Sequence, residues 1–329
     1  MKENNLRWVL HAVLRFLPLI LFAIIVASFS LMSSRFLDLR NMVNIVIQSA
    51  HIGILGIGMT FVLLTAGIDL SVGAIMYLAC AVFAVYLVAL PIWLALLAVC
   101  AIGAVFGAVN GFLITRLNVA SFIATLSTLF IGRGIALFVT GTQLITLPKP
   151  VLELGRTTIF GLSWTVWAFG LTLAVSLYVL SQTTFGRQVY AVGADPDAAS
   201  KAGIDVKRIL FFAFVICGFL AAVSSLVSAS QVGSISPNFG IQKEFAAIAA
   251  AVLGGTSLFG GRGGVLGTVF GAILIQTVQN GLVIINADPY IYPVVVASII
   301  FFAVMADSLR TNFLERIDQR PIRVEGQGS

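Results

Sequence analysis

The side chains that could do chemistry in this sequence are a few polar groups inside long apolar stretches. Asp69 lies in a break between two such stretches, residues 66–73, and Arg133 lies inside another. If these stretches cross a membrane, an ionisable residue there is costly and is by default a candidate for function. Asp69 has a structural alternative, because Asp69 or Ser71 could cap the helix that follows the break. Arg133 could line a polar path, or pair with an acid or with backbone carbonyls.

Amide and imidazole side chains extend this set of candidates. Gln48 and His51 are one helical turn apart in one apolar stretch, so they would share a face. Asn110 and Asn280 each lie near the end of an apolar stretch, in the similar sequences NGFLI and NGLVI. A lone histidine in an apolar helix is either a satisfied core residue or a ligand, and the sequence leaves both open. The candidates for a substrate path are therefore Gln48, His51, Asp69, Asn110, Arg133 and Asn280.

Enzymatic chemistry and nucleotide binding are not indicated. The sequence has no Ser/His/Asp set, carboxylate pair or Cys/His cluster, and Cys80, Cys100 and Cys217 lie in apolar stretches without metal-ligand spacing. The glycine-rich segment 253–264 lacks the GxxxxGK[ST] pattern of a phosphate loop, and Gly-Lys occurs nowhere in the chain. The basic residues form no patch that would favour nucleic acid. We expect no catalytic residue, no metal site and no cofactor bound by this chain.

The elements that must position these groups are membrane-spanning helices. The 329 residues are 59% hydrophobic and 10% charged, with a mean hydropathy of +1.06, whereas soluble domains are about 25% charged. A spanning helix needs roughly 20 apolar residues. The sequence predicts one all-α polytopic membrane domain over residues 1–329 with about ten spans. Apolar stretches lie near 14–33, 43–66, 72–90, 92–115, 120–140, 164–182, 209–230, 244–258, 264–285 and 291–308.

The distribution of positive charge predicts the orientation of these spans. With a cytoplasmic N-terminus, thirteen of the nineteen Lys and Arg residues lie on the inner side and five on the outer side, as the positive-inside rule requires. Both termini, the loop 183–208 and the tail 309–329 would then be cytoplasmic. The NGFLI and NGLVI sequences would face opposite sides, as in a five-plus-five inverted repeat. Two glycine ladders, at 103–111 and 263–271, repeat at a different offset.

The cytoplasmic loop contains a compact, charge-balanced segment, residues 193–208, with three charges of each sign. It predicts a short helix capped by Asp195, with Pro196 in its first turn, Asp197 near its positive end and Gly203 as its terminator. Such a helix could dock in a groove of a partner, and the alternative is a solvated loop. The small residues Ala198, Ala199 and Ala202 would form the docking face, with Lys201 contributing solubility.

Four motifs in order resemble the permease subunit of bacterial ABC importers for monosaccharides, the ribose and galactofuranose class. They are GMTFVLLTAGIDLSVGAI at 58–75, SFIATLSTLFIGRGIALFVTG at 121–141, TTFGRQVYAVGADPDAASKAGIDVKRI at 183–209 and AIAAAVLGGTSLFGGRGGVLGTVFGAI at 247–273. The chain departs from the family pattern at two places: Ala120 and Ser121 stand where a proline is frequent, and Ala246 stands where an acid is frequent.

The resemblance implies a vitamin-B12-importer-like, type II-like permease in the bacterial inner membrane, paired with a second permease subunit and surrounded by lipid. Two cytoplasmic P-loop ATPase subunits, which use the ATP, and a periplasmic sugar-binding protein would complete it. The segment Asp195 to Gly203 would be its coupling helix. Alternatives are a permease for autoinducer-2 or a nucleoside, and an ion-coupled secondary carrier.

Overall fold

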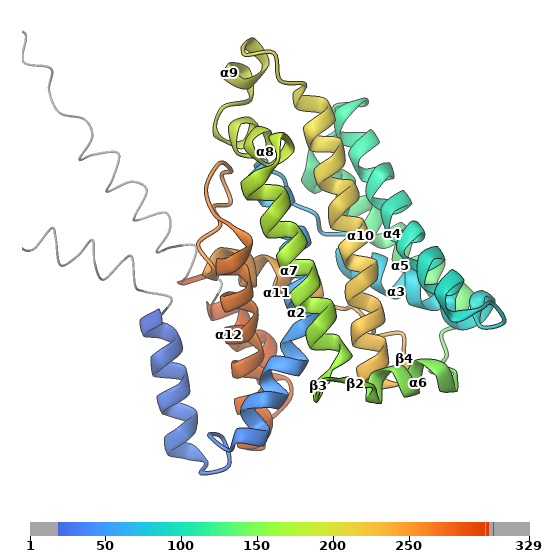
Figure 1. The fold of residues 1–329 in the computed structure, drawn as a ribbon, viewed down its shortest axis with the longest axis vertical. Helices are drawn as coiled ribbons and strands as arrows, with labels where there is room; N and C mark the ends of the chain where they lie inside the picture. The colour runs from blue at the N-terminus through green and yellow to red at the C-terminus, as the bar shows by residue number, and fades with distance from the viewer. Residues whose placement is uncertain (1–18, 300, 303–304, 306–329) are drawn as a thin grey trace, which may run out of the picture.

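A computed structural model describes residues 19–299, 301–302 and 305 (Figure 1). The described chain is a bundle of helices with a few two-residue strands. After a helix over Leu19–Met32, the elements are α2 (Leu39–Leu64), α3 (Val72–Val82), the π-helical turn η1 (Phe83–Leu87), α4 (Ile92–Thr115), α5 (Ser121–Thr140), β1 (Ile145–Thr146), α6 (Lys149–Arg156), β2 (Thr158–Ile159), β3 (Leu162–Ser163), α7 (Trp164–Gln182), α8 (Thr184–Ala194), α9 (Pro196–Lys201), α10 (Val206–Val232), β4 (Ser234–Ile235), α11 (Lys243–Leu253) and α12 (Val265–Ile284). Residues 291–299 are also helical.

Six described helices are long and apolar enough to cross a membrane: α2, α4, α5, α7, α10 and α12. The chain is therefore a multi-pass membrane protein. Within the described residues the other predicted stretches carry shorter helical segments, and α11 has only eleven residues. The predicted stretches 14–33 and 291–308 extend beyond the described residues, and the predicted tail 309–329 lies wholly outside them.

Helix α2 forms the centre of the bundle. In its most apolar 18-residue window, 83% of the residues are buried, against 22% in α4 and α7. It packs against α7, α10, α11 and α12. The helices around α2 expose large apolar side chains to their surroundings, as contact with lipid requires.

The glycine ladder of α4 packs this helix closely against α10. A β-carbon at Gly103 or Gly107 would meet the backbone carbonyl of Gly218 or Phe214 on α10. Close backbone approach through small residues is how helices associate in lipid. The second predicted ladder is only partly helical, because Gly263 lies in the loop before α12 with a φ of +131°. Gly267 and Gly271 of that ladder do pack, against α11.

The two ends of the bundle are built differently (Figure 1). At one end lie α8 and α9, together with the glycine-rich loop between α11 and α12. At the other end lie α6, the hairpin of β2 and β3, and a short pairing of β1 with β4 in which Ile145 lies opposite Ile235. The segment 183–208 and the segment 141–163 therefore project from opposite ends of α7.

Candidate functional site

The segment at one end of the bundle forms the predicted short helix. The side chain of Asp195 accepts hydrogen bonds from the backbone N–H groups of Asp197 and Ala198, both at 2.9 Å. Pro196 occupies the first turn, and Gly203, with a φ of +83°, follows the helix. The predicted helix, its cap and its terminator are confirmed. Its role in coupling stays a prediction.

The docking face expected on this helix is wrong in one residue. Ala198, Lys201 and Ala202 are exposed, but Ala199 is only 5% exposed and packs into the apolar core with Val192 and Ile209. The backbone carbonyl of Ala199 also accepts a hydrogen bond from the N–H of Ile204 at 3.0 Å. Of the two alanines in this six-residue helix, Ala198 faces outward and Ala199 faces the bundle, and Ala202 follows as the C-cap.

Helix α8 connects this segment to the interior. Gly193 lies directly against the backbone carbonyl of Leu64, the last residue of α2. The N–H of Gly261 donates to the same carbonyl at 3.0 Å. The hydroxyl of Tyr190 donates to the carbonyl of Gly263 at 3.0 Å. Burial raises the pKa of Tyr190 above its ordinary value. The end of α2, α8 and the glycine-rich loop thus form one connected region.

Asp69 lies in a buried network that holds the break between α2 and α3. Its Oδ1 accepts from the backbone N–H of Ser71 at 2.9 Å and from the hydroxyl of Ser71 at 2.6 Å. The amide of Asn110 on α4 donates to the same hydroxyl at 2.8 Å, and Thr128 on α5 donates to the Asn110 oxygen at 2.7 Å. Asp69 and Asn110 are fully buried. Asp69 therefore fixes the turn at Ser71, the residue directly before α3. Neither Asp69 nor Ser71 accepts a hydrogen bond from a backbone N–H within Val72–Val82, so the predicted side-chain cap of this helix is not formed.

The N-terminal ends of the short helices α3 and α11 meet inside the bundle. A β-carbon at Gly73 would overlap the carbonyl oxygen of Gly240, and a β-carbon at Gly240 would overlap that of Gly73. Gly240 also has a φ of +77°, which favours glycine. The carboxylate of Glu244, 8% exposed, lies beside Gly73 at the positive end of α3. Interrupted helices whose ends meet within the bundle are typical of transporter binding regions.

Arg133 holds the chain segment that leads to this meeting point. Its guanidinium donates to the backbone carbonyls of Pro237 at 2.9 Å and Phe239 at 3.0 Å. The same group lies over the ring of Tyr77 on α3, 5.4 Å from its centroid, where a cation is attracted to the ring face. Of the roles left open by the sequence, the geometry realises the pairing with backbone carbonyls.

A second set of polar contacts lies at the middle of α2. The Nζ atom of Lys243 is 3.2 Å from Nε2 of His51. One turn away, the amide of Gln276 on α12 donates to Oε1 of Gln48 at 2.9 Å. Farther along the same two helices, the amides of Asn41 and Asn280 donate to each other at 3.0 and 2.9 Å. The buried Nδ1 of His51 and Oε1 of Gln276 have no hydrogen-bond partner among the described residues.

The structure thus divides the predicted candidates into two groups. Asp69 and Asn110 lie in the network that holds the first break. In the second group, His51 and Arg133 contact the segment 236–244. Gln48 and Asn280 instead pair with Gln276 and Asn41 between α2 and α12. Together with Lys243, Glu244 and Gln276, three residues of the second group form what we call the central polar cluster: Gln48, His51, Arg133, Lys243, Glu244 and Gln276. Asn280, paired with Asn41, lies outside this cluster. Sequence reasoning missed Lys243, assigning it to an outer loop, because an adjacent lysine and glutamate usually mark the end of a span.

Comparison with known proteins agrees with this architecture. Residues 41–305 match the family described as branched-chain amino acid transport system, permease component. The ribose import permease of Bacillus subtilis is 39% identical over 296 residues, which is 89% of this chain and 91% of that protein. The ribose import permease of Haemophilus influenzae is 36% identical, over 87% of this chain and 90% of that protein. The galactose/methyl galactoside import permease of Salmonella typhimurium is 34% identical, over 94% and 97%.

No solved structure matches the chain significantly. The family match covers well over half of the sequence, and the relatives align over nearly their whole lengths. The chain therefore belongs to this family of transport-system permease components, together with the bacterial import permeases for ribose and galactose.

Proposed function

We propose that this chain is the transmembrane pore subunit of an ATP-driven importer in the bacterial inner membrane, and that its solute is a monosaccharide. The observation that carries the proposal is the likeness to ribose, fructose and galactose import permeases along most of the chain. The chain itself binds no ATP in this proposal. Separate P-loop ATPase subunits hydrolyse it, a periplasmic binding protein delivers the sugar, and a second permease subunit, identical or related, completes the pore.

The proposal includes a finer arrangement of the chain in the membrane. We infer ten spans of the vitamin-B12-importer-like type with both termini in the cytoplasm. The shorter helices α3 and α11 count as spans together with the irregular segments that precede them. Their meeting at Gly73 and Gly240 supports a five-plus-five inverted repeat, because each would be the interrupted helix of its own half.

Coupling to ATP hydrolysis would begin at α9. In this proposal Ala198 and Ala202, which are exposed, contact the ATPase, while Asp195, Pro196 and Asp197 fix the helix start. A displacement of α9 moves α8, which rests on Leu64 and the loop around Gly261. Leu64 directly precedes the break before α3, and the loop directly follows α11. One movement at the cytoplasmic end therefore reaches both interrupted helices, as alternating access requires.

The solute path would follow the central polar cluster. Gln48 and the neighbouring Asn44 are exposed on the first half of α2, and Gln242 is exposed just before α11. Polar side chains exposed at this depth face a water-filled path or a partner subunit rather than lipid. Amide groups both donate and accept hydrogen bonds, which suits the hydroxyl groups of a neutral sugar. We assign Asp69 and Asn110 a supporting role, because their hydrogen bonds hold the first break.

Uptake into vesicles tests the function. The permease would be reconstituted with its ATPase subunits and loaded binding protein, with ATP inside the space that represents the cytoplasm. We expect radiolabelled ribose or galactose to be transported when proton and sodium gradients are collapsed, and transport to stop when ATP is omitted. Transport that survives without ATP but stops with a protonophore would instead identify an ion-coupled carrier.

The same assay tests the solute class. A branched-chain amino acid, a nucleoside and autoinducer-2 serve as competitors, each in excess over the labelled sugar. Inhibition by unlabelled monosaccharides alone is the expected result. Transport of a competitor without any sugar uptake would contradict the proposal that the solute is a monosaccharide. The proposal that the protein is an ATP-driven importer would still stand.

A further inference from the structure

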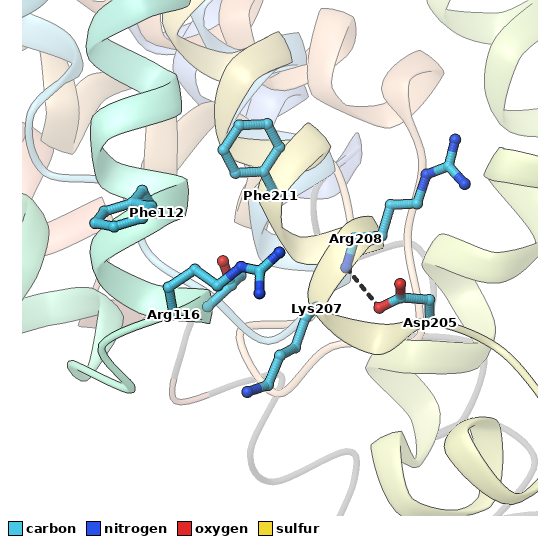
Figure 2. Close-up of a pocket in the computed structure, with 7 residues that line it drawn as sticks. Phe112, Arg116, Asp205, Lys207, Arg208 and Phe211 are labelled. Carbon is cyan, nitrogen blue, oxygen red and sulfur yellow. Dashed lines mark hydrogen bonds between the residues drawn. The ribbon is translucent and has the colours of Figure 1, made fainter.

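A cavity lies between the end of α4 and the start of α10, and none of the residues that line it belongs to the central polar cluster or to α9. It has a volume of about 700 Å³, and Figure 2 shows the residues that line it. Phe112 and Arg116 come from the end of α4, and Lys207 and Phe211 from the start of α10. In Figure 2 the rings of Phe112 and Phe211 lie farther along the two helices than the charged side chains of Arg116 and Lys207.

The charge of this cavity is positive. Arg116 and Lys207 are exposed and extend over its opening from two different helices (Figure 2). The acidic residue that lines it, Asp205, already accepts a hydrogen bond from the backbone N–H of Arg208 at 3.0 Å as the cap of α10. The side chain of Arg208 is turned away, over the ring of Phe212 at 5.9 Å. The charged groups of Arg116 and Lys207 are therefore the ones available to bind an anion in this cavity.

The flanks next to the cavity are apolar and exposed. Along α4, Phe112 is 51% exposed and Val105 63%, and along α10, Phe219 is 41% exposed. These side chains continue from the cavity toward the middle of the two helices, where the surroundings of a membrane protein are hydrocarbon. A soluble partner at the cytoplasmic end would not cover them. The basic side chains thus lie at the ends of the two helices and the exposed apolar side chains toward their middles. This is the order in which a membrane lipid places its head group and its acyl chains.

We propose that this cavity binds the head group of an anionic phospholipid of the inner leaflet, with its acyl chains along α4 and α10. A phosphodiester matches the forked donors of Arg116 and the compact charge of Lys207. Basic pockets between transmembrane helices on the cytoplasmic side bind such head groups. The inference is independent of the transported solute, so its failure would leave the proposed function untouched.

Lipid binding to the delipidated full-length permease in detergent tests the site, measured by native mass spectrometry. We expect phosphatidylglycerol to bind at least tenfold more tightly than phosphatidylcholine with the same chains. Glycerol phosphate at the same concentration should not compete, because it lacks the acyl chains. Equal binding of the two lipids, or full competition by glycerol phosphate, would overturn the proposal.

Paired variants locate the binding. Replacing both of these basic residues, R116Q with K207Q, should weaken phosphatidylglycerol binding roughly thirtyfold. The charge-conserving pair R116K with K207R should stay near wild type. The matched control, R187Q with R262Q, removes two exposed charges from the same end of the molecule but outside the cavity, and should change binding less than twofold. If the control variant lost as much phosphatidylglycerol binding as the cavity variant, the effect would come from the net charge of the protein, and the proposed site would be wrong.

Photo-crosslinking of wild-type protein keeps the proposal testable if a variant fails to fold. A phosphatidylglycerol with a diazirine near its head group should label peptides containing residues 112–117 and 205–212. Labelling elsewhere would contradict the site. If the pocket variant kept its lipid but lost co-purifying ATPase subunits, the cavity would belong to that protein partner, and the lipid proposal would be wrong.

Discussion

At the scale of single residues, Asp69 shows how a membrane-buried acid can serve structure. We expect Asp69→Asn to retain most transport, because an amide oxygen can still accept from the N–H and hydroxyl of Ser71. Asp69→Ala should destabilise the protein by about 1–3 kcal/mol, since it leaves buried donors unpaired. Thermal melting in detergent and vesicle uptake would be measured together. Lost uptake in the Asn variant with unchanged melting would mean that the charge gates the path.

The sequence supplied the alternatives for these residues, and the fold decided between them. A structural role for Asp69 was predictable from its place before an apolar helix, but its side chain bonds to Ser71 before α3 and caps no N–H of the helix itself. The contact of His51 with Lys243 was not predictable, because it joins residues 192 positions apart. The same holds for Arg133, whose two carbonyl acceptors belong to an irregular segment. No helical periodicity indicates where such a segment enters the bundle.

At the scale of elements, the meeting of α3 and α11 depends on two glycines. Gly73→Ala should strongly lower folded yield and melting temperature, because the added methyl overlaps the carbonyl of Gly240. Gly134→Ala on α5 is the matched control, since its β-carbon would meet nothing within 4 Å. It should be neutral or stabilise the helix by about 0.5–1 kcal/mol. A Gly73→Ala protein as stable as the control would show that the two helix ends can separate freely.

Helix α9 allows docking and folding to be separated. Ala198 is exposed and Ala199 is buried. Ala198→Trp should therefore leave folded yield unchanged and abolish most stimulation of ATPase activity by loaded binding protein. Ala199→Trp should instead reduce folded yield, since overpacking a core costs about 1–3 kcal/mol. Full stimulation with Ala198→Trp would show that this face does not contact the ATPase.

The elements were largely predictable because each apolar stretch carries helix within its described residues, and the breaks at 66–73 and 253–264 carry glycine. The segment 236–242, between the predicted stretches 209–230 and 244–258, brings Gly240 against Gly73 inside the bundle, a contact that no sequence pattern indicates. The face of α9 was misjudged at Ala199 for a related reason. A short helix of small residues has no apolar stripe from which its buried side can be predicted.

At the scale of the whole molecule, composition predicts the class of fold but not its centre. In lipid every span is apolar, so hydrophobicity does not distinguish the buried α2 from the peripheral α7. The small residues of α2 were a weak signal for this central position, as its Gly53, Gly56 and Gly58 each contact a neighbouring helix. Which end of the bundle faces the cytoplasm is inferred from the unequal distribution of Lys and Arg between the two ends.

Single cysteines in the segments that flank α7 at its two ends test this orientation. Thr158 in the β2–β3 hairpin and Ser200 in α9 are both exposed and project from opposite ends. If 183–208 is cytoplasmic, Thr158→Cys should react with an impermeant thiol reagent in intact cells, and Ser200→Cys only after lysis. The native cysteines should give little background, because Cys80 and Cys217 are buried and Cys100 is partly so. The reverse pattern would place α9 outside the cell, where no ATPase subunit could reach it, and would contradict both the topology and the coupling proposal.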